Sequence, residues 1–247
     1  MASTPHFKNR LQAGKKLSLA LVHYAGSADA LVLALPRGGV PVGFAVARAL
    51  ALPLDILLVR KLGLPGHEEF AMGAVGSGGV CVLNPAAMAA HDINTRDIDA
   101  ACTRELREIA RRERQYRGAR PMPQLAGKTL ILVDDGLATG STMRAAIRVA
   151  RSQQPARLVV AVPVGAPDTC AALAAEVDEL VCLIAPPVFR AVSQWYKQFE
   201  QTGDDEVQDL LALAWRDNAR RQNAFPERHP SNGGNHESNV ATRSPTR

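Results

Sequence analysis

Residues 129–142 read TLILVDDGLATGST, an apolar run that leads directly into two carboxylates and a loop of small residues. The run 129–133 is typical of a strand covered on both faces of its sheet. Asp134 and Asp135 follow it, and an amphipathic segment begins after the loop. Glycines let backbone N–H groups approach an anion, and a helix N-terminus presents unpaired N–H donors. The stretch therefore predicts a phosphate-binding loop, with the two carboxylates facing sugar hydroxyls or a metal ion.

A plain turn at Asp135-Gly136 is the competing interpretation of the same residues. An Asp-Gly pair is common in hairpin turns, where the chain returns as a second strand. Here the chain continues into a helical pattern over 142–153 instead, which favours the binding loop.

The rest of the chain alternates short apolar runs with amphipathic segments. The expected strands are 30–35, 54–59, 129–133, 158–162 and 179–183, and the expected helices are 41–51, 142–153 and 168–177. This alternation predicts an α/β fold with three layers, α/β/α, and a mostly parallel sheet. The runs 72–75 and 80–83 flank Gly76-Ser77-Gly78-Gly79, a hairpin pattern that predicts one antiparallel edge strand.

The charged segment 92–117 predicts one long helix. Its apolar residues, from Ile98 to Tyr116, recur on a single stripe, and the six arginines from Arg104 to Arg117 crowd the rest of its surface. We interpret the arginines as a solvated face around a packing stripe. The alternative is a surface for a phosphate-rich ligand or a partner.

Charge and composition limit the classes of function. The net charge is +5, but residues 216–247 carry six arginines against three carboxylates, so the body of the chain is close to neutral. Such a body has no general electrostatic footprint for nucleic acid. No apolar run approaches the ~20 residues that span a bilayer, and the N-terminus lacks the layout of a signal peptide. We expect a cytoplasmic protein that binds neither nucleic acid nor membrane.

We expect one domain over residues 1–217 and a disordered tail over 218–247. The tail holds five asparagines and three prolines with scarcely any apolar side chains. Such a segment cannot bury enough surface to offset its ordering entropy. The four cysteines form no C-x-x-C pair, which disfavours structural zinc and favours reduced, buried thiols.

The stretch 129–142 closely resembles the phosphoribosyl-pyrophosphate (PRPP) signature of type I phosphoribosyltransferases. That signature is a strand, two acidic residues and a small-residue loop containing Thr-Gly, in this order. The resemblance implies that Asp134 and Asp135 hold the ribose hydroxyls and that the loop holds the 5′-phosphate. The substrate-binding residues that it implies in the loop are Gly136, Ala138, Thr139, Gly140, Ser141 and Thr142.

Two further segments fit the same family. Arg37-Gly38-Gly39 follows the first expected strand, where the family has its diphosphate-binding loop, often with a non-proline cis peptide. Arg60-Lys61 ends the second strand, where the family has a flexible catalytic loop. The resemblance implies catalytic roles for Arg37, Lys61 and Asp135, and substrate-binding roles for Gly38, Gly39 and Arg60. Because ligands of such sheets bind at the carboxyl ends of the strands, we expect the Arg37 and Asp134 loops to converge.

The implied activity is transfer of the 5-phosphoribosyl group from PRPP to a nitrogenous base, with release of diphosphate. The implied cofactor is Mg²⁺ carried by the substrate, with Asp134 as the candidate protein ligand, and a homodimer is compatible with the family. The alternative is a non-catalytic PRPP-binding protein of the regulatory or competence type. Arg37 and Lys61 favour the enzyme, because in the family such residues serve chiefly the diphosphate.

The residues leave the nucleobase-like acceptor open. Family members that act on 6-oxopurines carry an acidic residue where this chain has Ala138, which disfavours hypoxanthine and guanine. The Leu-Ala-Thr-Gly form of the loop resembles the adenine and uracil branches, but no base-binding segment of either type accompanies it. We expect the aromatic residues of 189–196, after the last strand, to pack rather than to stack on a base.

Overall fold

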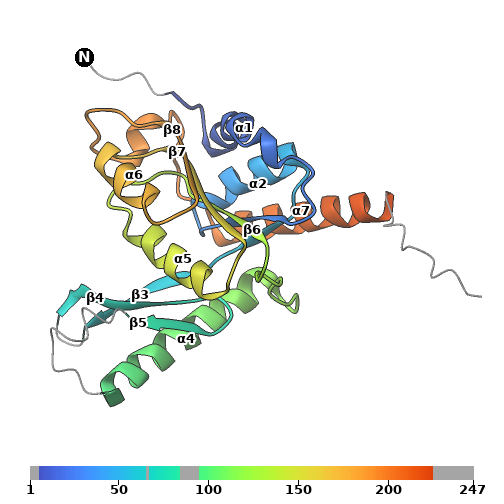
Figure 1. Cartoon of the computed structure of the whole chain (residues 1–247). Coiled ribbons are helices and arrows are strands. Elements are labelled where there is room, and N and C mark those ends of the chain that lie inside the picture. Colours follow the sequence, from blue (N-terminus) through green and yellow to red (C-terminus); the bar gives the residue numbers. More distant parts are fainter. Residues whose placement is uncertain (1–5, 65–66, 84–94, 225–247) are drawn as a thin grey trace, which may run out of the picture.

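The computed structural model describes residues 6–64, 67–83 and 95–224 of the 247-residue chain. At its centre lies a sheet of five parallel strands in the order β2-β1-β6-β7-β8 (Figure 1). The strands are β1 Ala30–Ala34, β2 Leu54–Ile56, β6 Thr129–Val133, β7 Arg157–Val164 and β8 Glu179–Ile184. Each lies within or around an apolar run that predicts it. β1 and β6 are buried along almost their whole length, because helices cover both faces of the sheet.

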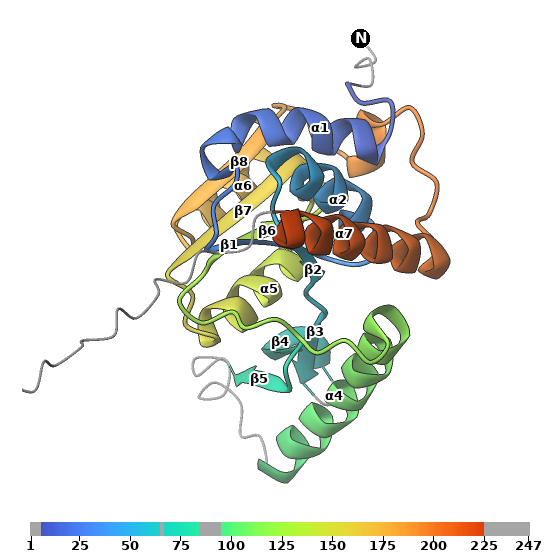
Figure 2. The ribbon, with the colours of Figure 1, turned by 90° about the vertical axis from the view of Figure 1, so that its right-hand side faces the viewer.

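Helices form the two outer layers (Figures 1 and 2). Side chains of α1 Arg10–Ala20, α2 Gly39–Leu50 and α7 Asp204–Ala224 join one hydrophobic cluster against the sheet. Side chains of α5 Ser141–Ser152 and α6 Pro167–Ala174 join a second cluster on the opposite face. Short 3₁₀ helices, η1 Val22–Tyr24 and η2 Val192–Trp195, lie in the connections. The predicted α/β/α fold is confirmed.

The antiparallel strands form a small sheet of their own rather than an edge of the main one. They are β3 Val59–Leu64, β4 His67–Gly76 and β5 Val80–Leu83, in the order β3-β4-β5. The expected strand 54–59 divides between the sheets, because Leu54–Ile56 pair with β1 whereas Val59 begins the pairing with β4. The expected hairpin around residues 76–79 is present between β4 and β5.

The predicted long helix is α4 Thr95–Arg117, which lies along the small sheet (Figure 2). Its last residue is anchored to the main sheet, since Arg117 Nε lies 2.7 Å from Asp55 Oδ1 and Nη2 donates to the Ile56 carbonyl. This ion pair is almost completely buried.

The cysteines correct one expectation. The sequence predicts that all four cysteines are reduced. In the structure, Cys81 on β5 and Cys102 on α4 form a disulfide instead. Twenty-one residues separate them in sequence, and the packing of α4 on the small sheet brings their Cα atoms to 6.4 Å. Cys170 and Cys182 are free thiols, the first buried and the second partly buried.

The expected boundary between residues 217 and 218 falls inside a helix. α7 continues to Ala224, so residues 218–224 are helical rather than part of a disordered tail. Two side chains of α7 bond to the chain at and just before β2: Trp215 Nε1 donates to the Leu54 carbonyl, and Arg221, within 218–224, donates to the Leu52 carbonyl. The remainder of the predicted tail lies outside the described residues. Within residues 6–224, gaps excepted, no helix has the length and hydrophobicity to cross a membrane.

Candidate active site

The two predicted loops lie side by side at the carboxyl ends of β1 and β6. These strands pair in parallel up to Ala34 and Val133, and the Leu35 N–H donates to the Val133 carbonyl at 2.9 Å. The peptide bond between Pro36 and Arg37 is cis, which fits the resemblance noted in the sequence. The main-chain pairing therefore brings residues 36–39 against the acidic pair.

Gly38 and Gly39 are glycines because the acidic pair leaves no room for a side chain. A Cβ on Gly38 would overlap the Asp135 carboxylate, and one on Gly39 would meet the Val133 carbonyl and the Asp134 Cα. The backbone of one loop thus touches the carboxylates of the other. The predicted convergence of these two segments is present in the structure.

Burial raises the pKa of both Asp134 and Asp135. The neighbouring Asp135 charge raises the pKa of Asp134 further, since two carboxylates held close together resist simultaneous ionisation. Asp134 Oδ1 accepts a hydrogen bond from the Asp135 N–H at 2.8 Å, which favours its ionised form. A cationic neighbour therefore favours the ionised form of this pair.

One such cation is Arg10, a residue that sequence analysis missed. Its Nε lies 2.8 Å from Asp135 Oδ2, and the side chains are only 12% and 15% exposed. Nη1 donates to the Glu200 carbonyl at 2.7 Å, and the guanidinium lies 3.8 Å from the Phe199 ring centroid. The hydrogen bond from Arg10 Nε to the Asp135 carboxylate lowers the pKa of Asp135 and so opposes the effect of burial.

The second missed residue is Tyr196, whose hydroxyl donates to the Asp135 carbonyl at 2.6 Å. Tyr196 and Trp195 are buried and pack with Phe7, so these aromatic residues serve packing, as expected. Neither Arg10 nor Tyr196 belongs to a recognisable motif, and each reaches Asp135 across more than sixty residues of sequence.

The predicted phosphate loop borders an open pocket of about 160 Å³, lined by Asp134, residues 136–143 and Val192. Gly140 precedes the first residue of α5 with φ +71°, a left-handed conformation that favours glycine. The Thr139 and Ser141 hydroxyls lie 3.2 Å apart at the start of the helix. The Ala138 side chain is exposed, and its carbonyl accepts from the Thr169 hydroxyl at 2.7 Å. Backbone donors and hydroxyls therefore surround a space suited to an anion.

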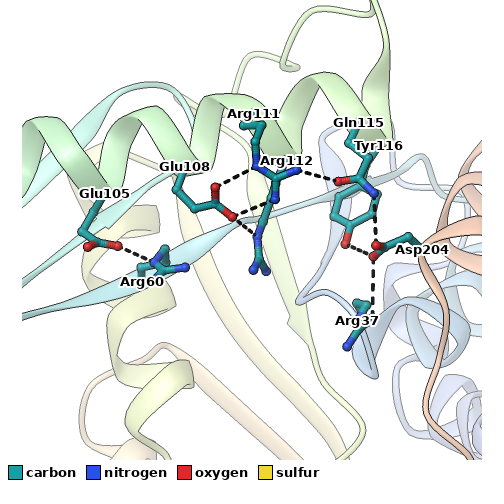
Figure 3. Close-up of polar contacts among 9 residues, drawn as sticks. All are labelled: Arg37, Arg60, Glu105, Glu108, Arg111, Arg112, Gln115, Tyr116 and Asp204. Atoms are coloured by element: carbon teal, nitrogen blue, oxygen red, sulfur yellow. Dashed lines mark hydrogen bonds and ion pairs between the residues drawn. The ribbon is translucent and has the colours of Figure 1, made fainter.

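The predicted cations Arg37 and Arg60 each lie beside a carboxylate from another element (Figure 3). Arg37 Nη1 is 3.8 Å from Asp204 Oδ1 at the start of α7. Arg60 Nε is 2.5 Å from Glu105 Oε2 on α4. Lys61 is not part of this arrangement. Successive side chains of a strand point to opposite faces, so Lys61 lies on the other face of β3 from Arg60. Its side chain is exposed, and within the described ranges it makes no ion pair. Its catalytic role stays a prediction.

Comparison with known proteins decides the family. The family model described as the phosphoribosyl transferase domain matches residues 6–200. The chain belongs to this family. The type I resemblance that residues 129–142 suggest is therefore confirmed.

Relatives of this phosphoribosyl transferase domain agree with that assignment. Proteins named "Putative phosphoribosyl transferase" in two strains of Mycobacterium tuberculosis are 45% identical over 211 residues, which is 85% of this chain. The chain spans about half the length of these relatives, since the match covers 47% of them. The crystal structure of TT1426 from Thermus thermophilus is similar at a TM-score of 0.77 and 41% identity, covering 84% of this chain and 98% of that one.

Proposed function

We propose that this phosphoribosyl transferase domain transfers the 5-phosphoribosyl group from PRPP to a nitrogenous base and releases diphosphate. The observation that carries the proposal is the meeting of two glycine-containing loops on one acidic pair, at the adjacent ends of β1 and β6. PRPP is a sugar with phosphate groups at both ends and a diol between them. Anion-binding loops on either side of two carboxylates match that distribution of charge.

Each part of the substrate has a proposed set of partners. The loop 136–142 binds the 5′-phosphate through backbone N–H groups at the start of α5 and through the Thr139 and Ser141 hydroxyls. Asp134 and Asp135 accept hydrogen bonds from the ribose hydroxyls. The residues proposed for the diphosphate are Arg37, Gly38, Gly39, Arg60 and Lys61.

The chemistry requires little covalent participation by the protein. The bond from ribose C1 to the diphosphate oxygen breaks, a C1–N bond to the base forms, and the N–H proton of the base is released. Positive charge develops on the ribose ring and negative charge on the departing diphosphate. Positioning of the reactants and cations directed at the diphosphate therefore account for most of the expected rate enhancement.

Mg²⁺ fits this site as an ion delivered by the substrate. Carboxylate oxygens are the ligands that Mg²⁺ prefers, and it usually retains water and phosphate ligands as well. Among the described residues, no group of three or more His, Cys, Asp or Glu is arranged to hold a metal ion. We propose that Asp134 contributes one ligand and that the diphosphate contributes others.

The direct test is diphosphate release with Mg²⁺, PRPP and a panel of purine, pyrimidine and simpler nitrogenous bases. Release that depends on one base supports the transferase and identifies the acceptor. Tight PRPP binding without release with any base contradicts the enzyme and supports the non-catalytic binding protein. The variant Asp134→Asn with Asp135→Asn should abolish PRPP binding by calorimetry while circular dichroism stays unchanged.

The catalytic assignments have a sharper test, which separates turnover from binding. Arg37→Ala and Lys61→Ala should lower kcat by about 10²–10³ each, because each removes a donor proposed for the leaving group. Binding of ribose 5-phosphate, which lacks the diphosphate, should change far less. Arg48→Ala is the matched control: it removes one exposed positive charge from the other end of α2 and should leave kcat unchanged.

A further inference from the structure

One face of α4 connects the two arginines proposed for the diphosphate. Glu105, Glu108, Arg112 and Tyr116 follow one another at spacings of three and four residues, which places them along one side of the helix. At one end of this face, Glu105 pairs with Arg60. At the other end, the Tyr116 hydroxyl donates to Asp204 Oδ1 at 2.5 Å, the same oxygen that lies 3.8 Å from Arg37. The face therefore spans the side of the site where the diphosphate is proposed to bind.

Arg112 extends from the middle of this face toward the space between Arg60 and Arg37 (Figure 3). It acts electrostatically on both Tyr116 and Asp204, and so does Arg37. The guanidinium groups of Arg112 and Arg37 thus both lie near the hydrogen-bonded pair of Tyr116 and Asp204.

Among the described residues, Arg112 keeps more donors for a ligand than its neighbour Arg111 does. Within the described part of the chain, Arg112 is hydrogen-bonded through Nε alone, to Glu108 at 2.8 Å, and its side chain is 41% exposed. Arg111 uses Nε and Nη2 on Glu108 and Nη1 on Gln115. Hydrogen bonds from both arginines lower the pKa of Glu108 to about 2, so this carboxylate stays ionised and holds the two side chains in place.

We propose that α4 supplies Arg112 as a third guanidinium for the diphosphate end of the substrate. The proposal rests on the proposed function and extends it to a residue that no strand-end motif contains. A guanidinium presents a planar fork of N–H donors that matches two phosphate oxygens, and diphosphate offers several such pairs. In this arrangement Glu105 and Asp204 hold Arg60 and Arg37 beside the ligand, and Glu108 does the same for Arg112.

Calorimetric titration with inorganic diphosphate and Mg²⁺ tests the assignment without any need for turnover. Arg112→Gln should weaken diphosphate binding by about tenfold or more, because it removes charged hydrogen bonds. It should leave ribose 5-phosphate binding within twofold of the wild type, because that ligand contacts the other loop. Arg111→Gln is the matched control: it removes the same charge and two hydrogen bonds to the same Glu108, and it should leave both affinities within twofold.

Equal diphosphate affinities for the Arg112→Gln and Arg111→Gln variants would overturn the proposal, as would a wild-type protein that binds no diphosphate. If Arg112→Gln does not fold, Arg112→Lys replaces it, since lysine keeps the charge and loses the fork. Undiminished diphosphate affinity in Arg112→Lys would then overturn the assignment. If diphosphate binding depends on Arg112 but no base releases diphosphate from PRPP, the Arg112 assignment stands and the proposed transferase activity fails.

Discussion

Replacement of Arg10 by alanine tests whether the acidic pair depends on a cation from α1. Arg10 contributes a 2.8 Å ion pair to Asp135, a hydrogen bond to the Glu200 carbonyl and a stacking contact with Phe199. Hydrogen bonds to charged groups contribute about 1.5–3 kcal/mol, and removal of one partner from a fully buried pair costs about 3–5 kcal/mol. Because both side chains retain some exposure, we expect Arg10→Ala to lower the free energy of unfolding by about 2–3 kcal/mol at pH 7.5.

The dependence on pH gives this prediction a second readout. Arg10 stabilises the ionised form of Asp135, whose pKa burial raises. The contribution of the ion pair is therefore present above the pKa of Asp135 and is lost as the pH falls through it. In Arg10→Ala that pKa rises further, so the variant loses stability relative to the wild type as the pH rises from the wild-type pKa of Asp135 to the new value. The destabilisation should be largest above both pKa values and should shrink as the pH falls below them.

Urea unfolding of four proteins at several pH values measures both effects. The set is the wild type, Arg10→Ala, Asp135→Asn and the double variant, which together form a double-mutant cycle. Arg144→Ala is the control, because its ion pair with Glu176 lies near the surface, with side chains 36% and 35% exposed, and surface pairs contribute about 0–1 kcal/mol. The reasoning is refuted if Arg10→Ala destabilises no more than Arg144→Ala, or if its cost is the same with and without the Asp135 carboxylate.

Three further substitutions follow from the geometry. Gly38→Ala places a methyl group on the Asp135 carboxylate, and we expect lost PRPP binding with about 1–3 kcal/mol of destabilisation; wild-type affinity in calorimetry would contradict this. Gly140→Ala forces alanine into φ +71° and should cost about 1–2 kcal/mol in urea unfolding, whereas Gly203→Ala, where a Cβ meets no atom within 4 Å, should cost less. Arg117→Ala leaves a buried carboxylate on β2 without its partner and should cost about 3–5 kcal/mol; a melting temperature equal to that of the wild type would refute the role of this pair.

The sequence predicts the main sheet and both loops because their positions depend on local patterns. Five apolar runs give five strands, and the order of strand, carboxylates, glycines and helix is complete within residues 129–142. α1 escapes prediction for a physical reason. Its buried face consists of Ala13, Gly14, Leu17 and Ser18, so no apolar stripe marks it, and the small residues instead allow close packing on α2.

The missed site residues depend on long-range packing that no local pattern encodes. Arg10 reaches Asp135 across 125 residues, and Tyr196 reaches it across 61. The disulfide was missed for the same reason, because the spacing of Cys81 and Cys102 says nothing about how α4 lies on the small sheet. Patterns of sequence therefore identify the two loops and the acidic pair, but not the distant side chains that influence the charge of that pair.

The two ends of the site are built with different rigidity, and this difference bears on how a substrate is held. The acidic pair and the phosphate loop follow β6 directly and are fixed by backbone pairing with β1 and by the start of α5. The diphosphate side is assembled from separate elements through ion pairs such as that of Arg37 with Asp204, whose side chains are 38% and 42% exposed. Exposed pairs of this kind are worth little and are easily exchanged for another anion. The acidic pair and the loop after it are therefore fixed by the main chain, whereas the proposed diphosphate end depends on side-chain ion pairs at the surface.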